Sequence, residues 1–323
     1  MREGAARQIL SVQAPRAVVM IRPHHFHPNP ETMADNSFQT SATAAATLVA
    51  ARAHDEVTRA CESLERAGVR VHLFDDLERE TPDSVFPNNW FSTHAGGHVA
   101  IYPMFVPNRR KERRWDIIEM LKRTYRVQDV IDYSGLEEDG LALEGTGAMV
   151  LDHIGRIAYA AKSNRCSDIA LERFCTHFNF EPVVFDAADR HRRLIYHTNV
   201  LMCVGTGFAL LGADTVVDPT RRREIVARLE ETGRVVIVLS HAQVEVFGAN
   251  ALELQGRDGA LLALSRRALE ALEPAQVALI ERHARLLPLD VPTIELAGGS
   301  VRCMMAGLHL TPRPAPADQN TGG

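Results

Sequence analysis

Five residues that could take part in catalysis recur at nearly constant spacing along the chain. They are Asn89, Glu144, His197, Asn250 and Cys303, separated by 55, 53, 53 and 53 residues. A thiolate is a nucleophile, an imidazole exchanges protons near neutral pH, and a carboxylate orients the imidazole or binds a substrate nitrogen. If the fold brings these positions together, they form the centre of a cysteine-dependent reaction. Taken singly, a cysteine or a histidine is more often a buried structural residue.

Glycines flank two of these positions. Cys303 follows the turn 298–300 (GGS), and Glu144 precedes residues 145–147 (GTG). Glycine lets the backbone turn sharply and approach a ligand closely. We therefore expect the thiol and the carboxylate to face a cavity, although a solvent-exposed turn is the alternative for Glu144.

The elements that must position these residues form a repeat. Paired apolar runs around turn residues predict hairpins at 90–104, 147–161, 200–212 and 251–265. Helices are expected to follow at 108–124, 165–178, 219–232 and 274–285, and strands at 127–131, 182–185, 235–239 and 286–289. A fifth copy is expected to be split between the chain ends, with a hairpin at 293–310, a helix at 37–67 and a strand at 69–74.

Five ββαβ units with a period near fifty residues predict a closed ring, in which equivalent positions converge near the axis. The alternative is a generic α/β domain whose hairpins are evenly spaced by chance. We expect one domain over residues 15–311, with disordered tails at 1–14 and 312–323.

Composition narrows the class of protein. The 323 residues carry a formal net charge of -5, which gives no reason to expect a nucleic-acid partner. Five widely spaced cysteines without a CxxC pair argue against a disulfide framework and a zinc ribbon. Neither a signal peptide nor a membrane-spanning run is recognisable, so a cytoplasmic protein without a membrane partner is expected.

Five segments, in order, resemble the motifs of the guanidino-group-modifying superfamily, which includes arginine deiminases and dimethylarginine dimethylaminohydrolases. The segments are 83–89 (DSVFPNN), 143–147 (LEGTG), 163–165 (SNR), 197–199 (HTN) and 298–303 (GGSVRC). The resemblance implies an α/β fold, the five-bladed ββαβ pentein propeller with pseudo-five-fold symmetry. Residues 22–39 add a likeness to the arginine-deiminase-related citrulline-utilisation hydrolases.

The resemblance also implies roles for individual residues. Cys303 would be the nucleophile, His197 the general acid and base, and Glu144 the group that holds the reacting nitrogens. Residues that would bind substrate are Asp83, Asn88, Asn89, Arg109, Arg165, Asn199 and Asn250. Among these, Arg165 and Arg109 would bind the α-carboxylate, because a planar guanidinium suits it. No metal or organic cofactor is implied.

One departure from the motifs points to the substrate. Where the arginine-type enzymes place a second carboxylate, this chain has Asn89. A cationic guanidinium favours two carboxylates nearby, whereas a neutral ureido group has a carbonyl oxygen that an amide can bind. We therefore expect citrulline to be hydrolysed to ornithine, carbon dioxide and ammonia through an S-carbamoyl Cys303.

Several alternatives stay open. Arginine deiminase, dimethylarginine dimethylaminohydrolase and amidinotransferase share the nucleophile, and a non-catalytic propeller that acts as a binding module needs none of the three catalytic residues. His24, His25 and His27 could suggest a metal site, but a Pro-rich loop at the pocket entrance is the simpler interpretation. The expected partner is a small amino acid, and a homodimer is left open.

Overall fold

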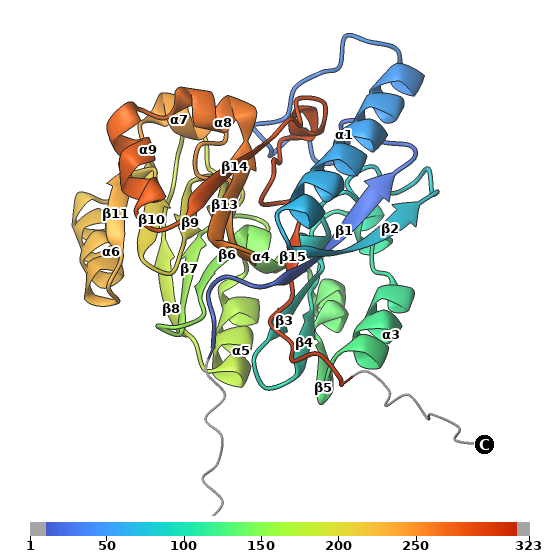
Figure 1. Cartoon of the computed structure of the whole chain (residues 1–323), viewed down its shortest axis with the longest axis horizontal. Helices are drawn as coiled ribbons and strands as arrows, with labels where there is room; N and C mark the ends of the chain where they lie inside the picture. The colour runs from blue at the N-terminus through green and yellow to red at the C-terminus, as the bar shows by residue number, and fades with distance from the viewer. Residues whose placement is uncertain (1–10, 315–323) are drawn as a thin grey trace, which may run out of the picture.

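The computed structural model describes residues 11–314, which form a mixed α/β fold with five three-stranded sheets (Figure 1). In each sheet the middle strand pairs antiparallel with one neighbour and parallel with the other. The sheets are β3 (Phe91–His94), β4 (His98–Ile101) and β5 (Asp129–Asp132); β6 (Met149–Asp152), β7 (Ile157–Ala161) and β8 (Glu181–Phe185); β9 (Met202–Val204), β10 (Phe208–Leu211) and β11 (Val235–Val238); β12 (Leu252–Gly256), β13 (Gly259–Ser265) and β14 (Arg285–Leu289); and β15 (Ala306–Gly307), β1 (Ala17–Pro23) and β2 (Arg70–Asp76).

A helix connects the middle strand of each sheet to its parallel neighbour, because two parallel strands cannot be joined by a tight turn. These helices are α1 (Ala46–Arg66), α3 (Trp115–Thr124), α5 (Asp168–Phe178), α6 (Pro219–Glu231) and α9 (Pro274–Glu281). Shorter helices are α2 (Pro107–Arg110), α4 (Gly145–Ala148), α7 (His241–Glu245) and α8 (Arg266–Ala271). Four of the five expected ββαβ units are therefore confirmed, with boundaries shifted by a few residues.

The fifth unit differs from the expectation. The hairpin expected at 293–310 is wrong, since this segment holds a 3-10 helix (Ile294–Ala297) and only the two-residue strand β15. The middle strand of the sheet is β1, the run AVVMIRP near the N-terminus, which pairs with β15 on one side and β2 on the other. Six of its seven residues are buried, which suits a strand covered on both faces. The two ends of the chain thus build one sheet together.

The expectation of one continuous charged helix at 108–124 is also wrong. It is split into α2 and α3, with Arg114 in an extended conformation between them (φ -118°, ψ 109°). The break lets α2 turn Arg109 into the interior, while α3 keeps its basic residues Lys122 and Arg123 exposed.

Residues 11–14 and 312–314 do not fit the expectation of disordered tails. The Gln13 amide donates to the backbone oxygens of Leu151 and Val204, at 2.9 Å each. Arg313 donates to the backbone oxygens of Lys122 and Tyr125. These contacts cross between distant parts of the chain and hold both segments in place. The rest of the two expected tails lies outside the described residues.

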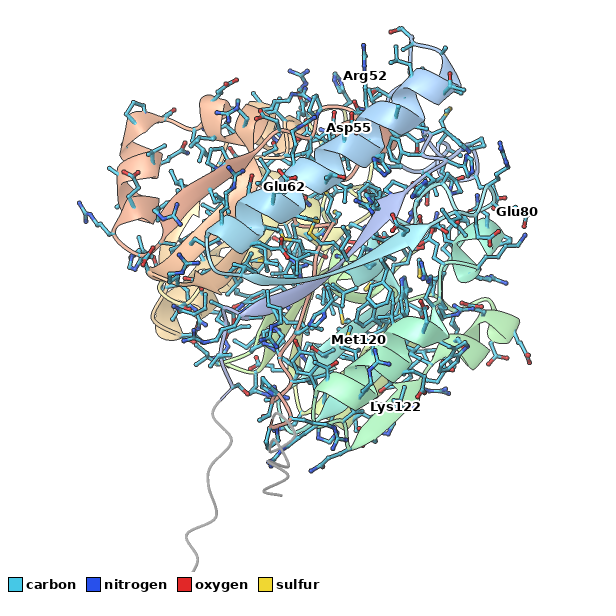
Figure 2. The ribbon with its side chains drawn as sticks, turned by 45° about the vertical axis from the view of Figure 1, so that its right-hand side comes forward. Arg52, Asp55, Glu62, Glu80, Met120 and Lys122 are labelled. Atoms are coloured by element: carbon cyan, nitrogen blue, oxygen red, sulfur yellow. The ribbon has the colours of Figure 1, made fainter. Side chains whose placement is uncertain are left out.

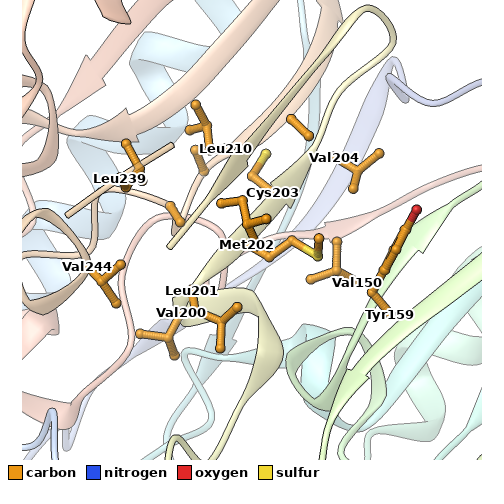
Figure 3. Close-up of a cluster of buried hydrophobic side chains, with 14 of the residues drawn as sticks. Val150, Tyr159, Val200, Leu201, Met202, Cys203, Val204, Leu210, Leu239 and Val244 are labelled. Carbon is orange, nitrogen blue, oxygen red and sulfur yellow. The ribbon is translucent and has the colours of Figure 1, made fainter. Parts of the chain in front are cut away.

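Apolar packing fixes the sheets relative to their helices. Figure 3 shows one cluster in which Val150 and Tyr159 of one sheet lie near Met202 and Cys203 of the next. On α1 the residues on the inner side are buried, whereas Arg52, Asp55 and Glu62 lie on its exposed side (Figure 2). Among residues 11–314, no helix combines the length and the apolar character that a membrane span needs.

Candidate active site

The five regularly spaced residues occupy equivalent places in the fold. Asn89 ends a 3-10 helix (Pro87–Asn89) before β3, Glu144 precedes α4 and β6, and His197 precedes a 3-10 helix (Thr198–Val200) before β9. Asn250 lies just before β12, and Cys303 just before β15. Each residue thus lies ahead of the first strand of a sheet, and all five are buried.

The carboxylate of Glu144 accepts hydrogen bonds from three side chains of the site. Its Oε2 accepts hydrogen bonds from His197 Nε2 at 2.9 Å, Arg109 Nη1 at 3.2 Å and Arg165 Nη1 at 3.3 Å. The backbone N–H of Phe105 donates to Oε1 at 3.1 Å. Burial alone would raise the pKa of Glu144, but Arg165 and Arg109 outweigh it and hold the pKa far below its usual value. The carboxyl group is therefore ionised and saturated with donors.

His197 is held as a neutral imidazole. Burial lowers its pKa to about 4, against the opposing effect of the hydrogen bond to Glu144. Because the ionised Glu144 can only accept, Nε2 carries the proton and Nδ1 is left unprotonated. This tautomer can take a proton at Nδ1, as a general base must.

The thiol of Cys303 lies between two amides. Its Sγ is 3.3 Å from Asn199 Nδ2 and 3.3 Å from Asn250 Nδ2. These two asparagines were expected to bind substrate, but in the structure their amides contact the sulfur itself. Asn250 also accepts from the backbone N–H of Arg302 through Oδ1, at 3.0 Å, which fixes the orientation of its amide. The two residues thus position the thiol.

The two arginines that donate to Glu144 have further partners. The guanidinium of Arg109 forms a bidentate pair with Glu112, at 2.9 and 3.0 Å, and its Nη2 donates to Asn89 Oδ1 at 3.0 Å. Arg165 pairs with Asp35 at 2.6 Å and lies over the ring of Tyr196, 4.9 Å from its centroid. Both guanidinium groups are almost completely buried.

A small pocket joins these groups. It brings together six of the residues expected from the sequence. Its lining residues are Asn36, Asp83, Phe86, Asn89, Arg109, Arg165, Tyr196, His197, Ala297, Gly299 and Cys303. Glu144, Asn199 and Asn250 lie behind this lining, in contact with its residues. Asn88 does not reach the pocket, because its amide bonds Thr146 Oγ1 at 3.4 Å.

Two buried polar atoms of the lining have no hydrogen-bond partner among residues 11–314. They are the amide nitrogen Nδ2 of Asn89 and the carboxylate oxygen Oδ1 of Asp83. The orientation of the Asn89 amide is set, since its Oδ1 accepts from Arg109. Unsatisfied buried groups are costly, and a ligand that bonds them would remove that cost. The pocket therefore offers one free donor and one free acceptor.

The glycines beside Glu144 are required by close contacts. A Cβ at Gly145 would lie 2.4 Å from the backbone oxygen of Asn88, and φ there is +46°. A Cβ at Gly147 would lie 2.2 Å from Asn89 Nδ2 and 2.8 Å from His197 Nδ1. Only glycine lets these two side chains lie against the segment that carries Glu144.

Sequence reasoning missed Asp35, Glu112 and Tyr196 as parts of the site. Glu112 lies three residues after Arg109, a spacing at which helical neighbours pair, and this was a usable signal. Tyr196 precedes His197 directly. Asp35 had no signal, because only the fold brings the N-terminal loop to Arg165, 130 positions away.

The possible metal ligands near the histidine-rich loop are not the three histidines that the sequence suggested. His24, His54 and Asp75 place a ligand atom each within 4.8 Å of one another. Asp75, however, is already paired with Arg22 through both carboxylate oxygens, at 2.7 and 3.0 Å. His25 and His27 are not part of this group.

Comparisons with known proteins agree with this arrangement. A family model described as N,N dimethylarginine dimethylhydrolase, eukaryotic, matches residues 22–310. No curated protein matches the chain. Among solved structures, the substrate-bound N-terminal domain of ArgZ, an arginine dihydrolase of cyanobacteria, aligns with a TM-score of 0.70 and 16% identity, over 91% of this chain and 99% of that one.

Two further structures share the fold. AgrE, in a ternary complex with ornithine and NAD+, aligns with a TM-score of 0.69 and 17% identity, over 93% of this chain but 40% of its own. The dimethylarginine hydrolase (DDAH) from Pseudomonas aeruginosa, complexed with citrulline, aligns with a TM-score of 0.61 and 13% identity, over 91% of this chain and 99% of that one. With the family match over nearly the whole sequence, they show that the chain belongs to the N,N dimethylarginine dimethylhydrolase family and, as its motifs indicated, to the guanidino-group-modifying superfamily.

Proposed function

We propose that the chain is a cysteine hydrolase of the ureido or guanidino group of a free amino acid, with citrulline as the favoured substrate. The observation that carries the choice of citrulline is the unpartnered Asn89 Nδ2 in the pocket lining. A ureido carbonyl oxygen needs a donor, and this amide nitrogen is one whose orientation Arg109 fixes. A guanidinium has no acceptor to offer it.

The state of Glu144 supports the same choice. Its negative charge is already shared by Arg109, Arg165 and His197. A cationic guanidinium would have to compete with these partners, whereas a neutral ureido group does not depend on free negative charge. The reacting end of the pocket therefore suits a neutral group.

The mechanism we propose uses the neutral His197 first as a base. Nδ1 takes the thiol proton of Cys303, the thiolate attacks the ureido carbon, and Asn89 holds the developing oxyanion. The imidazolium then gives the proton to the departing ornithine nitrogen as the C–N bond breaks, which leaves S-carbamoyl Cys303. Water, deprotonated by His197, releases carbamate and restores the thiol, and carbamate decomposes to carbon dioxide and ammonia. Glu144 stabilises the imidazolium throughout.

Substrate positioning falls to Arg165. We propose that the substrate α-carboxylate takes the place of Asp35 on this guanidinium, since both are carboxylates and Asp35 belongs to the N-terminal loop beside the pocket. The unpartnered Oδ1 of Asp83 would accept from the substrate amine. Arg109, held by Glu112 and Glu144, would add positive charge beside Arg165.

The five sheets support a closed five-bladed pentein propeller as the scaffold, and the family match over residues 22–310 supports one catalytic domain over residues 15–311. The residues that gather in the site precede a strand of each of the five sheets, as convergence at the axis of a ring requires. We propose that this propeller, as a single catalytic domain, is the architecture that builds the pocket.

Hydrolysis of arginine or dimethylarginine is the second candidate. The free carboxylate oxygen of Asp83 favours it, because a guanidinium carries N–H donors that this oxygen could accept. A non-catalytic binding module is disfavoured, since it has no use for a thiol, a neutral imidazole and an ionised carboxylate in one pocket.

The test is to incubate the purified chain separately with citrulline, arginine and dimethylarginine, and to assay ornithine, citrulline and ammonia. Cys303→Ser is the inactive variant, and Cys175→Ala, at a buried thiol of α5, is the matched control. Ornithine and ammonia from citrulline, lost only in Cys303→Ser, is the expected result. Formation of citrulline from arginine or dimethylarginine would support the cysteine mechanism and overturn the choice of substrate. If none of the three compounds is turned over, the proposal that the chain is an enzyme is refuted.

A further inference from the structure

A second cavity lies behind the catalytic residues. It is lined by residues of β3, β6, β9, β12 and β15, one strand from each of the five sheets. Cys203, which Figure 3 shows beside Met202 and Val204 on β9, is part of this lining. The lining includes Arg302, the residue before Cys303, and Ala251, the residue after Asn250, so the cavity adjoins the segments that carry the catalytic residues.

The polar groups of this cavity include a cation without a carboxylate partner. Arg302, the residue before Cys303, lines the cavity and donates from Nη1 to the backbone oxygen of Met305 at 3.0 Å. Within residues 11–314 no Asp or Glu oxygen lies within ion-pair distance of its guanidinium, unlike Arg109 and Arg165. Burial lowers the pKa of Arg302. Arg302 is only partly buried, and its guanidinium lacks, among the described residues, the carboxylate partner whose place a bound anion could take.

Two imidazoles add donors to the same cavity. The rings of His153 and His309 are stacked, with centroids 3.8 Å apart. Burial, with smaller effects from neighbouring cations, lowers the pKa of His309 to about 4 and that of His153 further. Each ring is therefore neutral and carries one N–H. Within the described chain, Nδ1 of His309 is buried without a hydrogen-bond partner.

The rim of the cavity is fixed by Gln13. Its side chain bonds the backbone of β6 and β9 through Leu151 and Val204, and its Oε1 accepts from the N–H of His153 at 2.9 Å. The hydroxyl group of Thr93, also in the lining, donates to the backbone oxygen of Gly307 at 3.0 Å. These contacts hold the walls in place around Arg302, so the cavity is a built site.

We propose that this cavity binds a small oxyanion, such as bicarbonate, phosphate or a carboxylate, on the guanidinium of Arg302 and the N–H group of His153, against which the ring of His309 is stacked. A planar guanidinium binds two oxygens of one anion at once, and a neutral imidazole completes the shell without a further positive charge. The space left between the lining side chains has room for more than one water-sized sphere. The site is independent of the substrate proposed above.

The experiment is a titration of the folded full-length chain, labelled with ¹⁵N in its histidines, with inorganic phosphate, bicarbonate and acetate in turn. Saturable shifts of the His153 and His309 resonances are expected, and calorimetry gives the affinity. Arg302→Gln should weaken binding about tenfold or more, which corresponds to about 1.4 kcal/mol. Arg165→Gln, the matched loss of one guanidinium in the active-site pocket, should leave these shifts unchanged.

Comparing the three anions shows whether the site prefers planar or tetrahedral ligands. Shifts with bicarbonate and acetate but not phosphate would assign the site to planar anions, and shifts with phosphate would extend it to tetrahedral ones. Absence of histidine shifts with all three in the wild-type chain would overturn the proposal without the need for a variant. Loss of binding in Arg165→Gln would overturn it too, because the anion would then occupy the active-site pocket.

Discussion

Gly147→Ala should disable the site while leaving the fold intact. The new methyl carbon would lie 2.2 Å from Asn89 Nδ2 and 2.8 Å from the His197 ring, and ordinary contact begins at 3.4 Å. The Asn89 amide must therefore move by about 1.2 Å and the imidazole by about 0.6 Å. A misplacement of about 1 Å costs on the order of 100-fold in rate, about 2.7 kcal/mol, so we expect kcat/KM to fall by about that factor.

The assay is steady-state turnover of whichever substrate the wild-type chain hydrolyses, with thermal unfolding measured in parallel. Gly135→Ala is the matched control, since a Cβ there meets nothing within 4 Å, and it should keep wild-type turnover. Full activity in a folded Gly147→Ala chain would refute the argument that Asn89 and His197 act from these positions. Loss of activity together with loss of the folded state would refute the claim that the effect is local.

Three further changes test separate parts of the structure. Asp35→Asn should lower KM about fivefold with little effect on kcat, because a partly exposed ion pair contributes about 1 kcal/mol and its carboxylate no longer competes for Arg165; a higher KM would mean that Asp35 itself binds substrate. Arg234→Met should lower the free energy of unfolding by about 3–5 kcal/mol in urea titrations, since it leaves Asp152 buried without its partner at 2.6 Å; an unchanged midpoint would contradict this. The pKa of His197 is about 4 in the folded state and 6.5 in the unfolded chain, so the free energy of unfolding is highest above pH 6.5 and falls by up to about 3 kcal/mol as the pH drops to 4. His197→Asn should flatten that decline in urea midpoints measured across this range. An unchanged slope would show that the imidazole is not the group responsible.

Local patterns were sufficient for most of the fold. Alternating apolar runs and turn residues identify the hairpins before α5, α6 and α9, because side-chain periodicity is a property of neighbouring residues. The same patterns failed for the sheet of β15, β1 and β2, whose strands come from opposite ends of the chain. The pairing of β1 with the two-residue β15 depends on closure of the whole fold, which no local pattern encodes.

By itself, the sequence determined which chemical groups are available and that they recur with the period of the fold: Cys303, His197, Glu144 and Asn89 each fall before the first strand of a sheet. Only the tertiary structure decided the contacts among them. Hydrogen bonds of about 3 Å between residues tens of positions apart arise from burial and packing, so the structure alone places Asp35 on Arg165. Because burial and neighbouring charges set pKa values, the structure also decides that His197 is neutral while Glu144 stays ionised.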